Sequence, residues 1–455
     1  MSRLVIVSNR VAMPREHQAG GLALGLSAAL REHGGIWFGW SGRVVEDGSP
    51  ELHRESQGNV DFHTLDLTAQ EHHEYYAGFA NRTLWPLFHF RPSLVDYSRT
   101  NWDAYVRVNA RFADHLVSLL RPDDLVWIHD YHLIPLAGLL RARGVRSRLG
   151  FFLHTPFPPL ELLRMLPVHR ELFDALAEYD LVGFQTADYL RSFRDYILHE
   201  VGGETNESGV TSVRGGRSSF RAGVFPIGID VDEVTRQAQC AVDQEACQQL
   251  QQSLEGRTLL IGVDRLDYSK GLPERFRAFG QLIDNVPDLC RRVTLLQIAP
   301  ASRSEVSEYR DLQHELEGIA GSINGRHAEP DWTPLRYVNR TYPHSALTGF
   351  MRMARVGVVT PLRDGMNLVA KEYVACQDPE DPGVLVLSRF AGAARELDGA
   401  ILVNPYDIEG MANALRAALS LSLDEREARW KSMMEVLRRN DIHAWRAGFL
   451  AALAA

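Results

Sequence analysis

The chain has 455 residues, of which 45% are hydrophobic and 24% charged, and its formal net charge is -9. This length is too great for one ordinary core and predicts a globular protein of two domains. The acidic balance argues against a nucleic-acid-binding protein, because such proteins usually carry a basic face. No apolar run reaches the ~20 residues that span a bilayer, and the first residues lead into a strand-like run that lacks the features of a signal peptide.

Short β-branched runs alternate with amphipathic helical patterns, which is typical of parallel α/β sheets. In the first half the expected strands are Leu4–Val7, Leu125–Ile128, Leu149–Leu153, Leu181–Phe184 and Val224–Ile227. A helix is expected over 102–120, and residues 202–219 are expected to form an exposed loop or hairpin because they are rich in Gly, Ser, Thr and Arg.

In the second half the expected strands are Leu259–Val263, Val293–Ile298, Leu335–Val338, Val356–Thr360, Val384–Leu387 and Ala400–Val403. Helical patterns cover 233–254 and 424–453, the latter with a break at Asn440-Asp441. The four cysteines (Cys240, Cys247, Cys290 and Cys376) lack metal-site spacing, which favours reduced thiols in a cytoplasmic protein.

The two halves are expected to share one architecture, with the boundary near residue 232. The predicted fold class is α/β, with two Rossmann-like domains facing across a cleft. The first domain covers residues 1–232 and the second covers 233–440. The last helix, about 441–455, is expected to pack back on the first domain.

Candidate site residues in the first half begin at the end of the first strand. Arg10 is placed where a cation could meet a phosphate, although a surface ion pair is the common alternative. Gly20 and Gly21 precede a helix, where glycines let a ligand approach backbone N–H groups, although a simple tight turn explains them as well.

Three aromatic clusters follow, and each contains a candidate for stacking on a sugar ring: Trp40 in Trp-Phe-Gly-Trp-Ser-Gly, Tyr76 in Glu-Tyr-Tyr, and Trp85 in Leu-Trp-Pro. Each aromatic residue alone is more often part of a core than a ligand contact. Because the three clusters lie beside glycine- and proline-containing turns, we expect a binding cleft.

Two further expected strands end in histidines. His129, Asp130 and His132 follow the first, and His154 follows the second. A metal site is the less favoured interpretation, because adjacent strand residues point to opposite faces. Asp230-Val231-Asp232 resembles the metal-binding Asp-x-Asp of some sugar transferases, but its place at the domain junction favours a helix start or a linker. No metal or cofactor is expected.

Two motifs in the second half form the strongest constellation. Arg265 and Lys270 flank a turn after a strand and suit a leaving diphosphate. Asp364 lies at the end of another expected strand, and the segment Leu368–Glu372 begins a helix whose N-terminus favours anions. Glu372 is suited to a ribose diol, and Asp364 to a hydroxyl of a donor sugar. Together the motifs predict a pocket for a sugar nucleotide.

These strings resemble the alpha,alpha-trehalose-6-phosphate synthase family, which comprises retaining, metal-independent glycosyltransferases. The resemblance runs from Leu4 to Ile442 and is greatest to the bacterial single-activity type. It implies that glucose 6-phosphate is bound by Arg10, Trp40, Tyr76, Trp85, Asp130 and Arg303. It implies that UDP-glucose is bound by Gly20, Gly21, Arg265, Lys270, Tyr342, Leu368, Val369, Ala370, Lys371 and Glu372. His154 and Asp364 are implied to contact the transferred glucose and, with Arg265 and Lys270, to form the catalytic set.

The implied reaction moves glucose from UDP-glucose to glucose 6-phosphate and gives alpha,alpha-trehalose 6-phosphate and UDP. Tyr342 stands where the family commonly has phenylalanine, so the preference among UDP, ADP and GDP donors stays open. A sister transferase that uses another nucleotide sugar and glycerol 3-phosphate or a cyclitol phosphate is the alternative. A dehydrogenase is disfavoured because G-x-G-x-x-G is absent, and a silent regulatory subunit because the charged residues are intact. The resemblance also implies a homo-oligomer, often a tetramer, without nucleic-acid or membrane partners.

Overall fold

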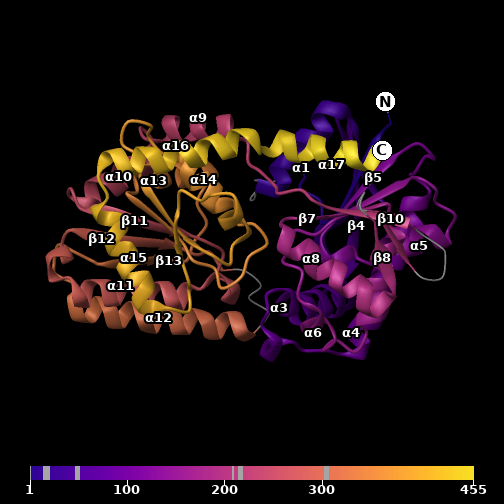
Figure 1. Cartoon of the computed structure of the whole chain (residues 1–455), viewed down its shortest axis with the longest axis horizontal. Coiled ribbons are helices and arrows are strands. Elements are labelled where there is room, and N and C mark those ends of the chain that lie inside the picture. The colour runs from indigo at the N-terminus through magenta and orange to yellow at the C-terminus, as the bar shows by residue number, and fades with distance from the viewer. Residues whose placement is uncertain (1, 14–20, 47–51, 207–209, 214–218, 302–306) are drawn as a thin grey trace. The chain divides into compact units, whose positions relative to one another are not determined.

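The computed structural model describes residues 2–13, 21–46, 52–206, 210–213, 219–301 and 307–455. The chain forms two compact units (Figure 1). Unit 1 comprises Met1–Ile227 and His443–Ala455, and unit 2 comprises Gly228–Ile442. The sequence places the first boundary at 232 and the start of the returning helix at about 441. No helix in the described ranges is long and apolar enough to cross a bilayer.

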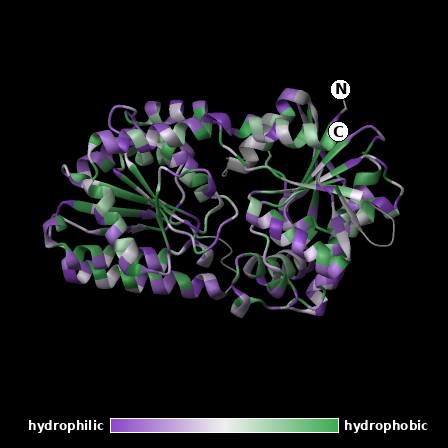
Figure 2. Cartoon of the chain, in the orientation of Figure 1, coloured by the Kyte–Doolittle hydropathy of each residue, from purple (hydrophilic) through white to green (hydrophobic). Residues whose placement is uncertain are grey.

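Unit 1 is built on a ten-stranded sheet of order β3-β4-β2-β1-β5-β6-β7-β10-β9-β8. The run from β4 to β10 is parallel, and β3, β9 and β8 add antiparallel edges. The central strands β1, β5, β6 and β7 are buried on both faces and appear hydrophobic in Figure 2, as in other parallel sheets. The strands are β1 (Leu4–Arg10), β2 (Gly35–Val45), β3 (His53–Gln57), β4 (Val60–Thr68), β5 (Leu125–His129), β6 (Arg148–Phe152), β7 (Leu181–Phe184), β8 (Gly203–Thr205), β9 (Val210–Val213) and β10 (Ser219–Val224).

Helices cover both faces of this sheet (Figure 1). The final helix of the chain, α17 (Ile442–Ala454), lies on the same face as α1 (Gly21–His33), and Arg446 of α17 pairs with Glu32 of α1. Phe449 of α17 stacks on Trp127 of β5, with ring centroids 4.6 Å apart. The other α-helices described in unit 1 are α2 (Ala69–Glu71), α3 (Trp85–Phe88), α4 (Arg99–Val117), α5 (Leu136–Ala142), α6 (Leu160–Leu163), α7 (His169–Phe173) and α8 (Ala187–Tyr196). Two π-helices, η1 (His72–Leu84) and η5 (Ile197–Val201), and three short 3-10 helices, η2 (Pro92–Leu94), η3 (Tyr131–Leu133) and η4 (Asp174–Glu178), are also described.

Unit 2 contains a six-stranded, wholly parallel sheet of order β13-β12-β11-β14-β15-β16. In chain order this is the 3-2-1-4-5-6 arrangement of a Rossmann fold, which reverses direction between its first and fourth strands. The strands are β11 (Thr258–Val263), β12 (Val293–Ile298), β13 (Leu335–Val338), β14 (Val356–Val359), β15 (Val384–Ser388) and β16 (Ile401–Val403). The predicted α/β class with Rossmann-like units is therefore confirmed.

Two layers of helices enclose the sheet of unit 2 (Figure 1). One layer contains α11 (Leu272–Asn285), α12 (Ser307–His327) and α15 (Ile408–Ser420). The other contains α9 (Val231–Ala241), α10 (Glu245–Leu254), α13 (His344–Met353), α14 (Leu368–Cys376) and α16 (Leu423–Arg439). Asp230 caps α9, because its carboxylate accepts a hydrogen bond from Glu233 N at 3.0 Å, which confirms the interpretation of Asp230-Val231-Asp232 as a helix start.

Two sequence-based expectations in unit 1 are wrong. The segment 225–227 is irregular, and the strand lies before it as β10, which pairs with β7 and ends at Val224. The Trp-Phe-Gly-Trp-Ser-Gly string, expected beside a turn, lies within β2, a strand in the interior of the sheet with Trp37 and Phe38 in the core. Its glycines hide the strand pattern, and Gly39 is required there, because a Cβ would lie 2.1 Å from Ser8 O of the neighbouring strand.

Candidate active site

The loops at the reversal point of the unit 2 sheet carry the two charged motifs. Arg265 and Lys270 follow β11, and Asp364 follows β14, its neighbour on the other side of the reversal. In open α/β sheets ligands bind outside the carboxyl ends of the strands at this point. The structure therefore brings together residues that lie about a hundred positions apart in the sequence.

Lys270 and Asp364 form an ion pair across this reversal. The Lys270 Nζ to Asp364 Oδ2 distance is 2.5 Å, and about an eighth of each side chain is exposed, 13% and 14%. Asn367 donates a second hydrogen bond to Asp364 Oδ2 at 3.1 Å. The ammonium is thus held at the carboxyl edge of the sheet, while Arg265, the second residue after β11, is exposed.

A buried arginine on α11 ties the surrounding segments together. Arg275 donates to Asp264 Oδ2 at 2.5 Å, to Gln297 Oε1 at 2.7 Å and to Thr360 Oγ1 at 3.0 Å. Burial raises the pKa of Asp264, and the charges of Arg275 and Lys270 oppose that shift. These bonds connect the ends of β11, β12 and β14, so Arg275 fixes the frame from which Lys270 projects.

The N-terminus of α14 supplies backbone donors. Asn367 has a φ of 77° and caps the helix through a bond from Ala370 N to its Oδ1 at 3.2 Å. Leu368 and Val369 open the helix and are partly exposed. The Lys371 side chain is fully buried and lies 2.6 Å from Glu396 Oε2. Any contact of Lys371 with an anion at this terminus would therefore use its backbone.

The remaining residues predicted to bind the donor lie on α14 and just before α13. Glu372 is 8% exposed, and its Oε1 lies 3.7 Å from Nε2 of His344, the first residue of α13. Tyr342 precedes α13, and the guanidinium of Arg340 lies 4.6 Å from the centre of its ring and 2.9 Å from its hydroxyl. The structure thus places the residues predicted for the base and the ribose on neighbouring elements.

In unit 1 the residues predicted for the acceptor lie near the ends of β1, β2 and β5. Arg10 ends β1, and its guanidinium lies against Gly42, where a Cβ would come within 2.7 Å of it. Trp40 of β2 contacts Tyr76 of η1, with ring centroids 5.3 Å apart. Tyr76 in turn stacks on His132 at 6.0 Å, and His132 contacts Tyr131, which contacts Trp85 at 5.8 Å. A continuous series of rings thus connects the three predicted aromatic residues.

Asp130 and His154 also lie together in unit 1. Asp130 has a φ of 73°, and its Oδ1 accepts a hydrogen bond from His154 N at 3.2 Å. The His154 ring lies between His129, whose Nδ1 is 3.1 Å from His154 Nε2, and Gln185, whose Nε2 is 3.5 Å from His154 Nδ1. Burial among these groups lowers the pKa of His154 to about 3, so its ring is neutral at ordinary pH.

Two predicted residues, Gly20 and Arg303, lie outside the described residues, and Gly21 opens α1. The described part of the chain contains no group of three His, Cys, Asp or Glu side chains that could hold a metal ion.

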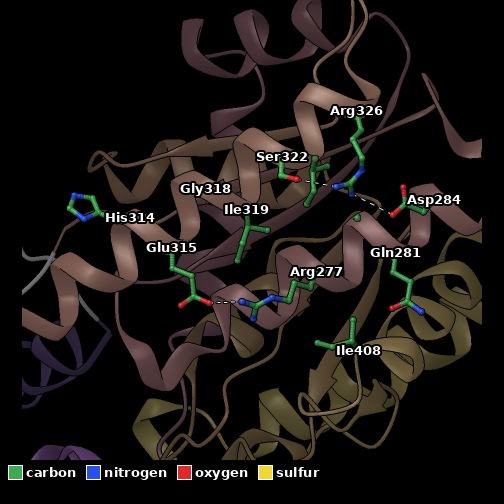
Figure 3. Close-up of a pocket in the computed structure, with 12 residues that line it drawn as sticks. Arg277, Gln281, Asp284, His314, Glu315, Gly318, Ile319, Ser322, Arg326 and Ile408 are labelled. Atoms are coloured by element: carbon green, nitrogen blue, oxygen red, sulfur yellow. Dashed lines mark hydrogen bonds and ion pairs between the residues drawn. The ribbon is translucent and has the colours of Figure 1, made fainter.

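Unit 2 also has a groove of about 580 Å³ between α11, α12 and the start of α15 (Figure 3). Ion pairs cross it, Arg277 with Glu315 and Arg326 with Asp284. It is distinct from the candidate site, because no predicted site residue within the described ranges lines it.

Sequence reasoning missed three side chains that contact the predicted residues: Arg275, Gln185 and His344. Arg275 carries a signal, since it is a charged residue on the otherwise apolar buried face of α11. The sequence suggests only a less favoured metal role for His129, whereas the structure pairs its ring with that of His154. Gln185 and His344 carry no signal of their own in the sequence, because their partners are distant along the chain.

Comparison with known proteins agrees with this geometry. The profile of Glycosyltransferase family 20 matches residues 3–455. A trehalose-6-phosphate synthase from Klebsiella pneumoniae is 49% identical over 452 residues, which cover 99% of this chain and 94% of that protein. The crystal structure of a UDP-forming alpha,alpha-trehalose-phosphate synthase from Burkholderia xenovorans in complex with glucose-6-phosphate is 51% identical, with a TM-score of 0.96 and coverage of 100% of both chains. A structure named as trehalose-6-phosphate from E. coli bound with UDP-2-fluoro glucose is 46% identical, with a TM-score of 0.95 and coverage of 100% of this chain and 99% of that one.

The two Rossmann-like units and their charged strand ends define a nucleotide-sugar-dependent glycosyltransferase. The chain belongs to glycosyltransferase family 20. The resemblance stated from the sequence is therefore confirmed.

Proposed function

We propose that the chain transfers glucose from UDP-glucose to glucose 6-phosphate and forms alpha,alpha-trehalose 6-phosphate and UDP. The observation that carries the proposal is the Lys270–Asp364 pair at the reversal point of the unit 2 sheet. It combines a cation for a diphosphate with a carboxylate for a sugar hydroxyl beside a helix N-terminus. The relatives' complexes with glucose-6-phosphate and UDP-2-fluoro glucose support the same pair of substrates.

In this proposal unit 2 binds the donor. Backbone N–H groups of the segment Leu368–Lys371 and the side chains of Arg265 and Lys270 contact the diphosphate, Glu372 accepts hydrogen bonds from the ribose diol, and Tyr342 contacts the base. Asp364 holds a hydroxyl of the glucosyl group. Unit 1 binds the acceptor: Arg10 contacts its phosphate, and Trp40, Tyr76, Trp85 and Asp130 contact its ring. Arg303, which belongs to the segment of unit 2 and lies outside the described residues, is the second residue expected at that phosphate.

The proposed reaction retains the configuration at C1 and uses no metal. The bond from glucosyl C1 to the phosphate oxygen breaks, C1 bonds to the acceptor hydroxyl oxygen on the same face, and the acceptor proton passes to a phosphate oxygen of the leaving UDP. Arg265 and Lys270 stabilise the charge that develops on the diphosphate. His154 is neutral and so contacts the glucosyl group as a hydrogen-bonding partner rather than as a cation.

The direct test is release of UDP from UDP-glucose with and without glucose 6-phosphate, with NMR of the product to identify the α,α linkage. ADP-glucose and GDP-glucose as donors, and glycerol 3-phosphate as acceptor, test the sister transferase. UDP release that depends on glucose 6-phosphate supports the proposal, and its absence contradicts it. Activity in EDTA tests metal independence, and light scattering tests the homo-oligomer that the family resemblance implies. A cytoplasmic location is part of the proposal and is supported by the absence of disulfides among the four cysteines.

A further inference from the structure

A series of polar side chains leads from α9 to Glu372, the acid proposed for the ribose. It begins at Glu233 and Gln237 on α9, continues through His344 at the start of α13, and ends at Glu372 on α14. Gln237 Nε2 donates to Glu233 Oε1 at 2.6 Å. His344 Nδ1 lies 2.8 Å from Gln237 Oε1, and His344 Nε2 lies 3.7 Å from Glu372 Oε1.

The positions of the protons follow from this geometry. A carboxylate only accepts hydrogen bonds, so the amide nitrogen of Gln237 must face Glu233 and its oxygen must face His344. His344 Nδ1 therefore carries a proton. If His344 were neutral, Nε2 would present a lone pair to the carboxylate of Glu372. The arrangement is favourable only when both ring nitrogens of His344 are protonated.

The charges around His344 agree with this assignment. The carboxylate of Glu372, 3.7 Å away, raises the pKa of His344, burial opposes the shift, and Glu233 raises the pKa further. Glu372 faces His344 from α14, and Glu233 faces it from α9. Glu233 also forms an ion pair with Arg236, 2.6 Å away. The third helix against α13 is α10, whose Cys247 lies beside Gly349, more than a turn from His344.

The orientation of Glu372 follows from the contact with His344. Its Oε1 faces the imidazole, and no donor among the described residues is within hydrogen-bond distance of Oε2. An ionised carboxylate close to a helix N-terminus that binds a diphosphate would repel that anion. A positive His344 offsets this repulsion while it holds the carboxylate in one orientation.

We propose that His344 is a positioning residue for the donor nucleotide: its imidazolium orients Glu372 toward the ribose diol, and nucleotide affinity falls as His344 loses its proton. This inference rests on the proposed function, because it takes Glu372 as the ribose contact. It assigns no chemical step to His344, so the effect is expected in KM for UDP-glucose and in the Kd for UDP, with kcat nearly unchanged.

The test is isothermal titration of UDP and of 2′-deoxy-UDP into the wild-type chain and three variants between about pH 6 and about pH 9. Wild-type affinity for UDP should fall with rising pH, and His344→Gln should bind UDP about tenfold more weakly at the acid end and show little of that pH dependence. His327→Gln is the matched control, because His327 pairs with Asp284 at 2.6 Å in the same unit and should not affect UDP binding. Phosphate protons of UDP titrate in all variants, so the difference from His344→Gln isolates the imidazole.

The Gln237→Leu variant is expected to keep its affinity for UDP as the pH rises, whereas His344→Gln is expected to bind UDP weakly. Without Gln237 Oε1, a neutral His344 can place its proton on Nε2 and donate to Glu372, so UDP affinity should be retained at about pH 9, where wild type has lost it. The dependence on His344 should be small for 2′-deoxy-UDP, which has lost half of the diol.

Equal affinity and equal pH dependence in wild type and folded His344→Gln would overturn the inference, as would the same dependence for 2′-deoxy-UDP. If His344→Gln melts before binding can be measured, the behaviour of Gln237→Leu decides. Failure of the wild type to bind UDP or to release it from UDP-glucose would instead contradict the proposed function. The two failures are therefore distinguishable.

Discussion

Replacement of Lys270 by methionine tests the proposed chemistry most directly. The change removes the ammonium 2.5 Å from Asp364 and keeps most of the aliphatic volume. Removal of one donor from a preorganised site that stabilises developing charge costs about 3 to 4 kcal/mol of transition-state stabilisation. We therefore expect kcat to fall by about 100-fold to 1,000-fold.

The stability of this variant should change much less than its rate. The pair is partly exposed, and Asn367 still donates to Asp364, so we expect a loss of only about 1 kcal/mol in the free energy of unfolding. Turnover is measured as UDP released with both substrates saturating, and stability by urea denaturation. Lys431→Met is the matched control, because Lys431 pairs with Glu427 at 2.8 Å on the exposed face of α16. A Lys270→Met enzyme within threefold of the wild-type rate, about 0.7 kcal/mol, would refute the assigned role.

Three further outcomes are expected. Arg275→Met should lower the free energy of unfolding by about 3 to 5 kcal/mol, measured in urea, because it leaves buried Asp264 without its cation, and a loss near 1 kcal/mol would show that the network is dispensable. Gly271→Ala should reduce both thermal stability and kcat/KM, because φ is 64° and a Cβ would lie 2.3 Å from Thr360 O, so wild-type values in both assays would contradict the close approach. The pKa of His344 is raised in the folded chain, so its pair stabilises fully below about pH 6.5 and is lost as pH rises through the folded pKa. The difference in Tm between wild type and His344→Gln should accordingly shrink with rising pH, and a difference that grows would contradict the pairing.

The sequence predicts well those parts of the fold in which local pattern and final environment agree. The runs Leu125–Ile128 and Leu259–Val263 are short and apolar, and both became buried parallel strands. The sequence does not predict the strands β2 and β4, because glycines, aromatic residues and charged residues interrupt their apolar runs. There the strands are specified by close backbone approach and by neighbours such as β1, which local composition does not contain.

The candidate site divides in the same way. Arg265, Lys270 and Asp364 were predictable because each follows a strand-like run, and the rule for strand ends places such residues together. The contacts of Lys371 and His344 were not predictable from the sequence, because their partners, Glu396 and Gln237, come from other elements. A sequence identifies the charged residues of a site more readily than the partners that orient them.

The placement of α17 in unit 1 affects how the chain can be synthesised and divided. Unit 2 is one uninterrupted segment, whereas unit 1 needs the last 13 residues, His443–Ala455, to cover Trp127 and its neighbours. During translation unit 2 can therefore complete its core first, while unit 1 keeps an uncovered aromatic surface until residues His443–Ala455 have left the ribosome. A stop codon just before α17 would leave that surface open to chaperones and aggregation, although every strand of both sheets had been made.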